Sequence, residues 1–158
     1  MSNAIVRGSL AGAALLVLGG LVPAQERLPQ PETYCVSTPN SFTRGAEMGW
    51  LGHVEISRND FALVVSGAVP QSIGIFLWGS EAQRLPFGSG YLCIASPVHR
   101  LDPPQIVSDS GHAIFKIDFR DDFHGGMFAP GTSCNFQFLY RDGTRFNLSN
   151  GLRVPFAR

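Results

Sequence analysis

The chain has 158 residues, with 12 basic and 12 acidic side chains, so its formal net charge is zero. Charged residues make up only 15% of it, and no basic run is present to attract nucleic acid or an anionic membrane. Gly, Pro and Phe are frequent, at 18, 11 and 12 residues, which is typical of an all-β domain rather than a helical one.

The first 24 residues have the pattern of a secretion signal. Arg7 precedes an apolar run, 10–22, and the run ends in the short residues Val22-Pro23-Ala24 that a signal peptidase reads. The run is too short for a membrane-spanning helix, which needs about 20 residues. We therefore expect a signal peptide over 1–24 and a secreted or cell-surface protein with no membrane span after cleavage. Its mature chain would begin near Gln25, with a net charge of about −1.

A short polar segment follows the expected cleavage site. Residues 25–32 include Pro29 and Pro31, and they predict an extended tether. No second linker and no internal repeat follows, so residues 33–158 are expected to form one domain.

Alternating apolar and polar residues predict β-strands through the rest of the chain. The expected strands lie near residues 54–56, 61–65, 73–78, 91–95, 113–119, 134–140 and 152–156. Segment 73–78 is apolar on both faces and is therefore expected to be a central strand. Turn-forming residues separate the strands at 57–60, 79–90, 102–104, 109–111, 125–126 and 142–143. Asp142-Gly143 is the strongest hairpin signal.

This pattern of short strands and turns predicts an all-β fold. Seven or eight strands at short spacing are typical of a two-sheet antiparallel β-sandwich, of which the jelly roll is one form.

The three cysteines fit an oxidising compartment in which two of them pair. We favour a disulfide between Cys35 and Cys93, which would tie the start of the domain to a central strand. Cys134 would then be a buried thiol that packs as a small apolar residue. Cys93–Cys134 is the competing pair, and sequence alone does not choose between the two.

Aromatic side chains are the candidate ligand-binding residues. Trp78 lies in an apolar strand and is expected in the core, whereas Trp50 lies in the glycine-rich stretch 49–52 and is the aromatic most open to exposure. Trp50 and Tyr91, exposed in one shallow groove, would favour binding of sugar rings. The competing interpretation is that both simply pack in the core.

A carboxylate cluster follows the strand predicted near 113–119. Asp118, Asp121 and Asp122 could supply oxygen ligands to Ca²⁺ at the strand end, although the spacing is not that of an EF-hand loop. The simpler interpretation is a solvated strand end before the turn at 125–126. No other cofactor is expected.

No sequence motif indicates catalysis. The histidines at 53, 99, 112 and 124 lack metal-ligand spacing, and no GxSxG motif occurs. Paired carboxylates can act in a glycosidase, but no further polar cluster is available here to form a cleft. Asn147-Leu148-Ser149 is a glycosylation sequon that matters only in a host that glycosylates secreted proteins.

Four short blocks carry a resemblance to a known domain family. They are Tyr34-Cys35, Gly90-Tyr91-Leu92-Cys93, Asn135-Phe136-Gln137 with Tyr140-Arg141-Asp142, and 146–152. The chain resembles a family of small domains in secreted and cell-surface proteins of planctomycete-like and myxobacteria-like bacteria. The resemblance implies export, an all-β domain and a non-enzymatic role, and it carries over no catalytic residues because the family has no assigned activity.

Three hypotheses for function follow. The leading one is a secreted, non-catalytic β-sandwich with a structural or surface- or matrix-binding role, whose partner is a polysaccharide or a cell-envelope protein. The second is a carbohydrate-binding domain, stabilised by Ca²⁺ at the carboxylate cluster. The third, and least supported, is a small secreted hydrolase.

Overall fold

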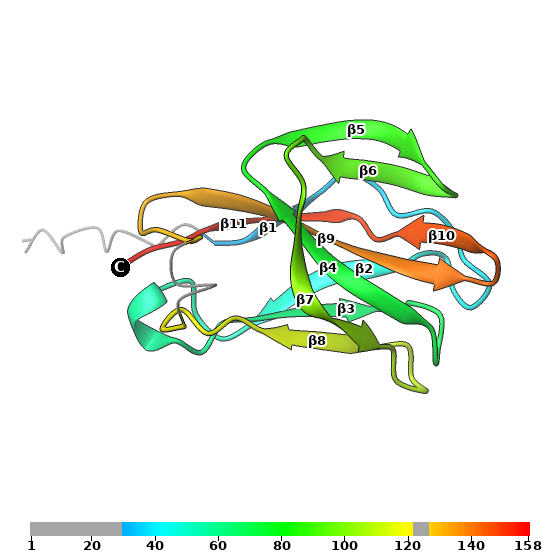
Figure 1. Ribbon diagram of the computed structural model, residues 1–158, viewed down its shortest axis with the longest axis horizontal. Helices are drawn as coiled ribbons and strands as arrows, with labels where there is room; N and C mark the ends of the chain where they lie inside the picture. The colour runs from blue at the N-terminus through cyan, green and yellow to red at the C-terminus, as the bar shows by residue number, and fades with distance from the viewer. Residues whose placement is uncertain (1–29, 122–126) are drawn as a thin grey trace, which may run out of the picture.

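The described part of the chain, residues 30–121 and 127–158 of a computed structural model, is all-β (Figure 1). Every pair of named strands within it is antiparallel. The strands are β1 (Glu32–Tyr34), β2 (Glu47–Leu51), β3 (Ala62–Ser66), β4 (Ile73–Gly79), β5 (Ala82–Phe87), β6 (Gly90–Ile94), β7 (His99–Ile106), β8 (Ala113–Lys116), β9 (Ser133–Asp142), β10 (Arg145–Leu148) and β11 (Gly151–Pro155). A single-turn 3-10 helix, η1 (Ile56–Arg58), lies between β2 and β3.

The strands form two facing sheets and a separate hairpin. The large sheet has the order β1-β11-β9-β4-β7, with β10 also paired to β9, and the small sheet has the order β2-β3-β8. The β5–β6 hairpin lies on the side of the large sheet that faces away from the small sheet (Figure 1). The predicted antiparallel sandwich is therefore confirmed, and the hairpin adds a third, partial layer.

The core lies between the two sheets. Phe76, Phe136 and Phe138 of the large sheet have no exposed surface, and neither have Leu63 and Val65 of the small sheet. The rings of Phe76 and Phe138 lie 4.6 Å apart on neighbouring strands. Because alternate residues of a strand point to opposite faces, these positions account for the alternation seen in the sequence. Aromatic rings are prominent in this core, and each buries a large apolar area.

The last three strands run from a tight hairpin into a bulge. The predicted hairpin at Asp142-Gly143 is confirmed: Asp142 pairs with Arg145, and Gly143 has a φ of +61°. The register along β9 then shifts at Ser149, whose backbone N–H donates to Phe138 O and whose Oγ accepts from Phe138 N. Such a bulge bends the strand and separates β10 from β11.

Four local predictions differ from the structure. Segment 79–90, predicted as a turn, contains β5, which is largely exposed and therefore lacks the alternation of a half-buried strand. The predicted turn at 102–104 lies within β7, where prolines are tolerated because β7 is an edge strand. The loose stretch 49–52 belongs largely to β2, and the strand predicted at 54–56 is replaced by a single bridge at Glu55 and the start of η1.

Cys35 and Cys93 form the favoured disulfide, and the Cys93–Cys134 alternative is wrong. Cys134 is a free thiol on the inner face of β9, where only 4% of its surface is exposed. Burial raises the pKa of this thiol to about 11. No helix in residues 30–121 or 127–158 is long and apolar enough to span a membrane.

Candidate functional site

The outer face of the large sheet, which faces away from the small sheet, is apolar. Ile75 and Leu139 are paired across β4 and β9 and point outward, and Leu77 follows on the same face of β4. This explains why segment 73–78 is apolar on both faces: its inner side chains contribute to the core, and its outer side chains lie on the face against which the β5–β6 hairpin packs, where Leu77 is buried and Ile73 is exposed. The outer face is covered by that hairpin over only part of its length (Figure 1).

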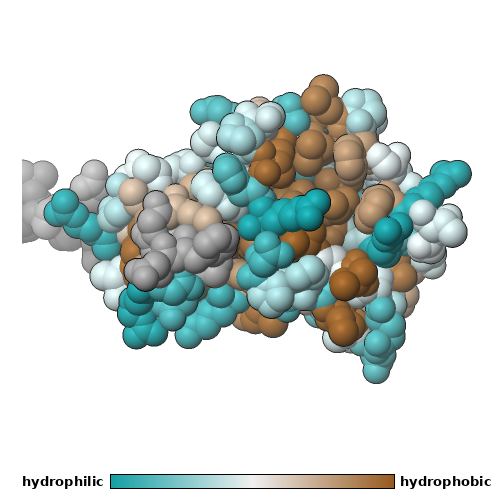
Figure 2. Space-filling view, in the orientation of Figure 1, coloured by the Kyte–Doolittle hydropathy of each residue, from teal (hydrophilic) through white to brown (hydrophobic). Residues whose placement is uncertain are grey.

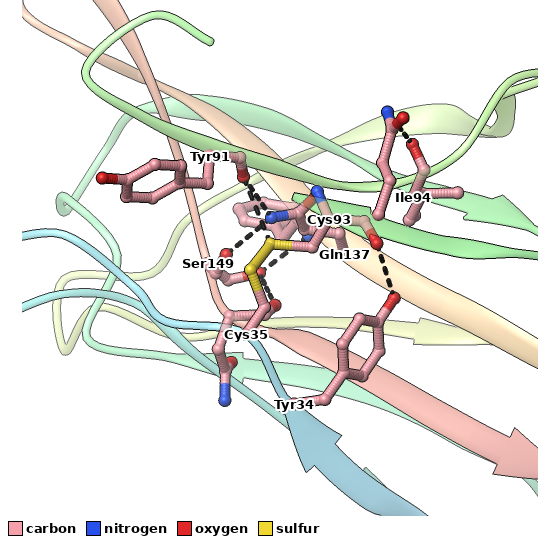
Figure 3. Close-up of a disulfide and its surroundings, with 10 residues drawn as sticks. Tyr34, Cys35, Tyr91, Cys93, Ile94, Gln137 and Ser149 are labelled. Atoms are coloured by element: carbon pink, nitrogen blue, oxygen red, sulfur yellow. Dashed lines mark hydrogen bonds between the residues drawn. A yellow bond between two sulfur atoms is a disulfide. The ribbon is translucent and has the colours of Figure 1, made fainter. Parts of the chain in front are cut away.

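A buried side-chain amide connects the hairpin to the large sheet by hydrogen bonds. Gln137 has no exposed surface, and its Oε1 accepts from Cys93 N at 2.9 Å (Figure 3). Its Nε2 donates to Tyr91 O at 2.8 Å and to Ser149 O at 2.7 Å. The side-chain amide of Gln137 thus meets the edge of β6 as a neighbouring strand would, with one acceptor and one donor.

Other contacts fix the hairpin at both ends. The disulfide joins Cys93 to Cys35, and the Tyr34 hydroxyl donates to Cys93 O at 2.9 Å (Figure 3). Burial raises the pKa of Tyr34 to about 12. At the turn of the hairpin, Ser89 N donates to Phe146 O at 2.9 Å. The hairpin is therefore held in one position relative to the sheet before any ligand binds.

Two neighbouring open hollows lie on the outer face, one between β7 and β10 and the other under the hairpin. One has a volume of about 230 Å³ and the other of about 220 Å³, and both are lined by Arg100 and Leu139. Phe87 and Leu92 of the hairpin line the second hollow, and Phe146 of β10 lines the first. We call the two together the outer-face groove. Figure 2 shows hydrophobic surface on and beside the hairpin, crossed by a strip of hydrophilic atoms.

The groove is lined by three of the nine exposed large apolar residues of the described chain. Ile73, Phe87 and Phe146 line it and are 54%, 45% and 39% exposed. Ile106 pairs with Ile73, and Leu85 pairs with Leu92, so both share faces with lining residues. Single exposed apolar residues are ordinary, but a contiguous patch marks an interaction site.

Two arginines supply the charge in the groove. Arg100 lines both hollows, and Arg141 lies over the Phe146 ring, 3.9 Å from its centroid. Neither guanidinium is paired with a carboxylate of the described residues, whose arginine ion pairs involve Arg58, Arg120 and Arg153 instead. The groove is thus an apolar surface with unneutralised positive charge.

The structure does not bring Trp50 and Tyr91 together. Trp50 lies in β2 of the small sheet, where it is partly buried against the core. Tyr91 lies in β6, on the other side of the large sheet, and the guanidinium of Arg84 lies 4.3 Å from its ring centroid. The two rings therefore share no groove, and neither lines the outer-face groove.

Asp118 has a structural role. Its Oδ1 accepts from Asn59 Nδ2 at 2.8 Å and from the backbone N–H and Nε of Arg120 at 3.0 and 3.2 Å. These hydrogen bonds, led by that from the Arg120 side chain, lower the pKa of Asp118 to about 2. Asp121 N lies 3.4 Å from Asp118 O, and Asp122 lies outside the described residues. Within those residues, no three His, Cys, Asp or Glu side chains gather to hold a metal ion.

Two other polar sites are structural. His53 Nδ1 lies 2.7 Å from Asp60 Oδ2, and this contact lowers the pKa of Asp60 and closes the loop between β2 and β3. The sequon residue Asn147 has no exposed surface, and its amide contacts Thr38, Pro39 and its own neighbour Leu148. In the folded chain its Nδ2 is therefore not accessible for glycosylation.

The chain matches no family model, no curated protein and no solved structure. The sequence does not predict the outer-face groove, because the groove depends on β5, which lies in the segment 79–90 that the sequence predicts as a turn. One signal did point to it: an internal strand that is apolar on both faces needs something to cover its second face.

Proposed function

We propose that this protein is a secreted, non-catalytic binding domain and that its ligand occupies the outer-face groove. The observation that supports this most directly is the contiguous apolar surface beside a hairpin that Gln137 and the disulfide hold in place. A preformed concave surface loses little conformational entropy on binding. The disulfide fits an oxidising, extracellular compartment.

The lining of the groove favours an apolar ligand over a polysaccharide. A sugar site needs several polar side chains placed to meet ring hydroxyls, alongside aromatic faces for stacking. The polar side chains of the groove are Arg100 and Arg141, whereas its floor is formed by Ile75, Leu77 and Leu139. The aromatic pair that would have favoured sugar binding lies in separate layers.

A neutral apolar dye tests this proposal. We expect N-phenyl-1-naphthylamine to bind the purified protein saturably with a rise in fluorescence, and we expect Leu139→Asn to weaken binding at least about tenfold, since it removes apolar surface shared by both hollows. Ile114→Asn is the matched control, because Ile114 is 52% exposed on β8 of the small sheet. Equal loss in both variants, or in neither, would contradict a binding site in the groove.

A further inference from the structure

We propose, building on the proposed function, that the outer-face groove binds a single-chain acyl anion, an aliphatic chain that ends in an acidic head group. The proposal rests on the combination of two apolar hollows and two guanidinium groups that form no ion pair with a carboxylate of the described residues. Each feature alone would fit many ligands, but together they define an amphiphile of negative charge.

Two arginines supply the positive charge of the groove. Arg100 lines both hollows, and Arg141 lines the one that also contains Ile73 and Phe146. Both arginines are exposed, so an ionised head group can reach them and form charge-assisted hydrogen bonds, which are stronger than neutral ones. An acidic head near Arg100 would therefore leave apolar surface on both sides for the attached chain.

The lining of the hollow under the hairpin suits a methylene chain. Leu77, Leu92, Val98, Leu139 and Leu148 line the hollow under the hairpin together with Phe87 and Arg100. These aliphatic side chains offer no hydrogen-bonding groups. Each methylene of a ligand that is transferred from water to such a surface contributes about 0.8 kcal/mol to the free energy of binding. The two hollows, of about 230 and 220 Å³, are individually small and share Arg100 and Leu139 in their linings.

The strands beside the groove favour an acyl chain over a peptide as the ligand. A peptide that adds to a sheet edge needs a row of backbone donors and acceptors. Pro86 lies in β5, and Pro103 and Pro104 lie in β7, so each of these strands lacks a backbone N–H at those positions and offers an interrupted row of donors. A ligand held by apolar contact and one charged head does not need such a ladder.

Calorimetry with three probes of equal chain length tests the proposal: dodecanoate, dodecanol and dodecyltrimethylammonium, each below its micellar concentration. We expect dodecanoate to bind at least about tenfold more tightly than the other two, the scale of one charge-assisted hydrogen bond. Arg100→Gln should reduce that preference by weakening dodecanoate binding more than dodecanol binding. Arg84→Gln is the matched control, because Arg84 packs over Tyr91 and lines neither hollow.

The outcomes separate this inference from the proposed function. Equal affinity for the three head groups, lost in Leu139→Asn, would overturn the anion preference and leave the apolar groove standing as the binding site. Dodecanoate binding that survives both Arg100→Gln and Leu139→Asn would place the site elsewhere and overturn the inference. Absence of binding by all three probes would also overturn it, and the dye experiment would then decide the proposed function by itself. Binding of an apolar peptide but not of dodecanoate would replace the acyl ligand.

Discussion

The two faces of the large sheet are built from the same strands but have different surroundings. Phe76, Phe136 and Phe138 point inward and are completely buried in the core. Ile75 and Leu139 point outward from the same strands and lie beside a two-stranded hairpin that covers the face only in part. Apolar composition therefore does not distinguish a core from a binding surface; the difference lies in what covers each face.

The way each face is covered also differs. The inner face contributes side chains to the core cluster that it shares with the small sheet. The outer face meets the hairpin through the Gln137 amide, the Cys35–Cys93 disulfide, the Tyr34 hydroxyl and a backbone hydrogen bond from Ser89 to Phe146. We infer that the inner face supplies most of the stability of the domain and that the outer face keeps apolar surface open for a ligand.

The largest expected effect is a difference in lost stability between substitutions at two adjacent residues of β9. Phe138→Ala should lower the free energy of unfolding by about 3–5 kcal/mol, because it leaves a cavity in a closed core. Leu139→Ala should cost well under half as much, because its side chain borders an open hollow. Urea denaturation of both variants measures the difference. Similar losses would show that the outer face is as closed as the inner one.

Removal of the disulfide should affect the hairpin more than the core. Cys35→Ala with Cys93→Ala should cost about 2–4 kcal/mol of stability, since a crosslink over 58 residues no longer restricts the unfolded chain. Dye binding in the groove should weaken as well, while near-ultraviolet circular dichroism of the core aromatics is retained. Cys134→Ala, which leaves the crosslink intact, is the control. Unchanged dye affinity in the double variant would mean that the disulfide does not position the hairpin.

Gln137→Ala should loosen the hairpin by a smaller amount. The substitution leaves Cys93 N–H, Tyr91 C=O and Ser149 C=O without their partner, and we expect a loss of about 1–3 kcal/mol. Hydrogen exchange at the Cys93 amide should become faster. Gln83→Ala, which removes a single bond to Ile94 O, should change that amide little. Full protection of Cys93 in Gln137→Ala would contradict the role given to this amide.

The smallest effect is a pH dependence on the inner face. The pKa of Cys134 is raised from 9.0 to about 11 in the folded chain by burial, so the unfolded chain ionises first. The stability that this group contributes is complete below about pH 9 and is lost as the pH rises through about 11. Cys134→Ala should therefore flatten the fall in unfolding free energy over this range. Part of the fall should remain, because Tyr34 shifts in the same direction. An unchanged slope would show that Cys134 ionises equally in both states.

The fold could be predicted from the sequence where one face of a strand is buried. Alternation revealed β3, β8, β9 and β11, and the Asp142-Gly143 pair marked the last hairpin. Strands without that alternation were missed: β5 is exposed along most of its length, and β7 is an edge strand that contains Pro103 and Pro104. Edge and surface strands take their conformation from tertiary pairing, which sequence periodicity does not record.

The candidate site was less predictable than the fold. Trp50 and Tyr91 were chosen for their residue type, yet the fold places them in separate layers. The residues that line the groove are mainly aliphatic side chains, with Phe87, Phe146 and two arginines, and they come from β4, β5, β6, β7, β9 and β10 and from the segment before β7. Such a site has no motif, because its chemistry arises only when these strands and the hairpin are brought together.

Chemical-shift mapping by NMR, during titration with N-phenyl-1-naphthylamine, tests the central claim most directly. We expect the shifted amides to cluster on the outer face, around Arg100, Leu139 and Phe146, and those of β2, β3 and β8 to stay in place. Shifts confined to the small sheet, or spread evenly over both sheets, would contradict the assignment of the outer-face groove as the binding surface.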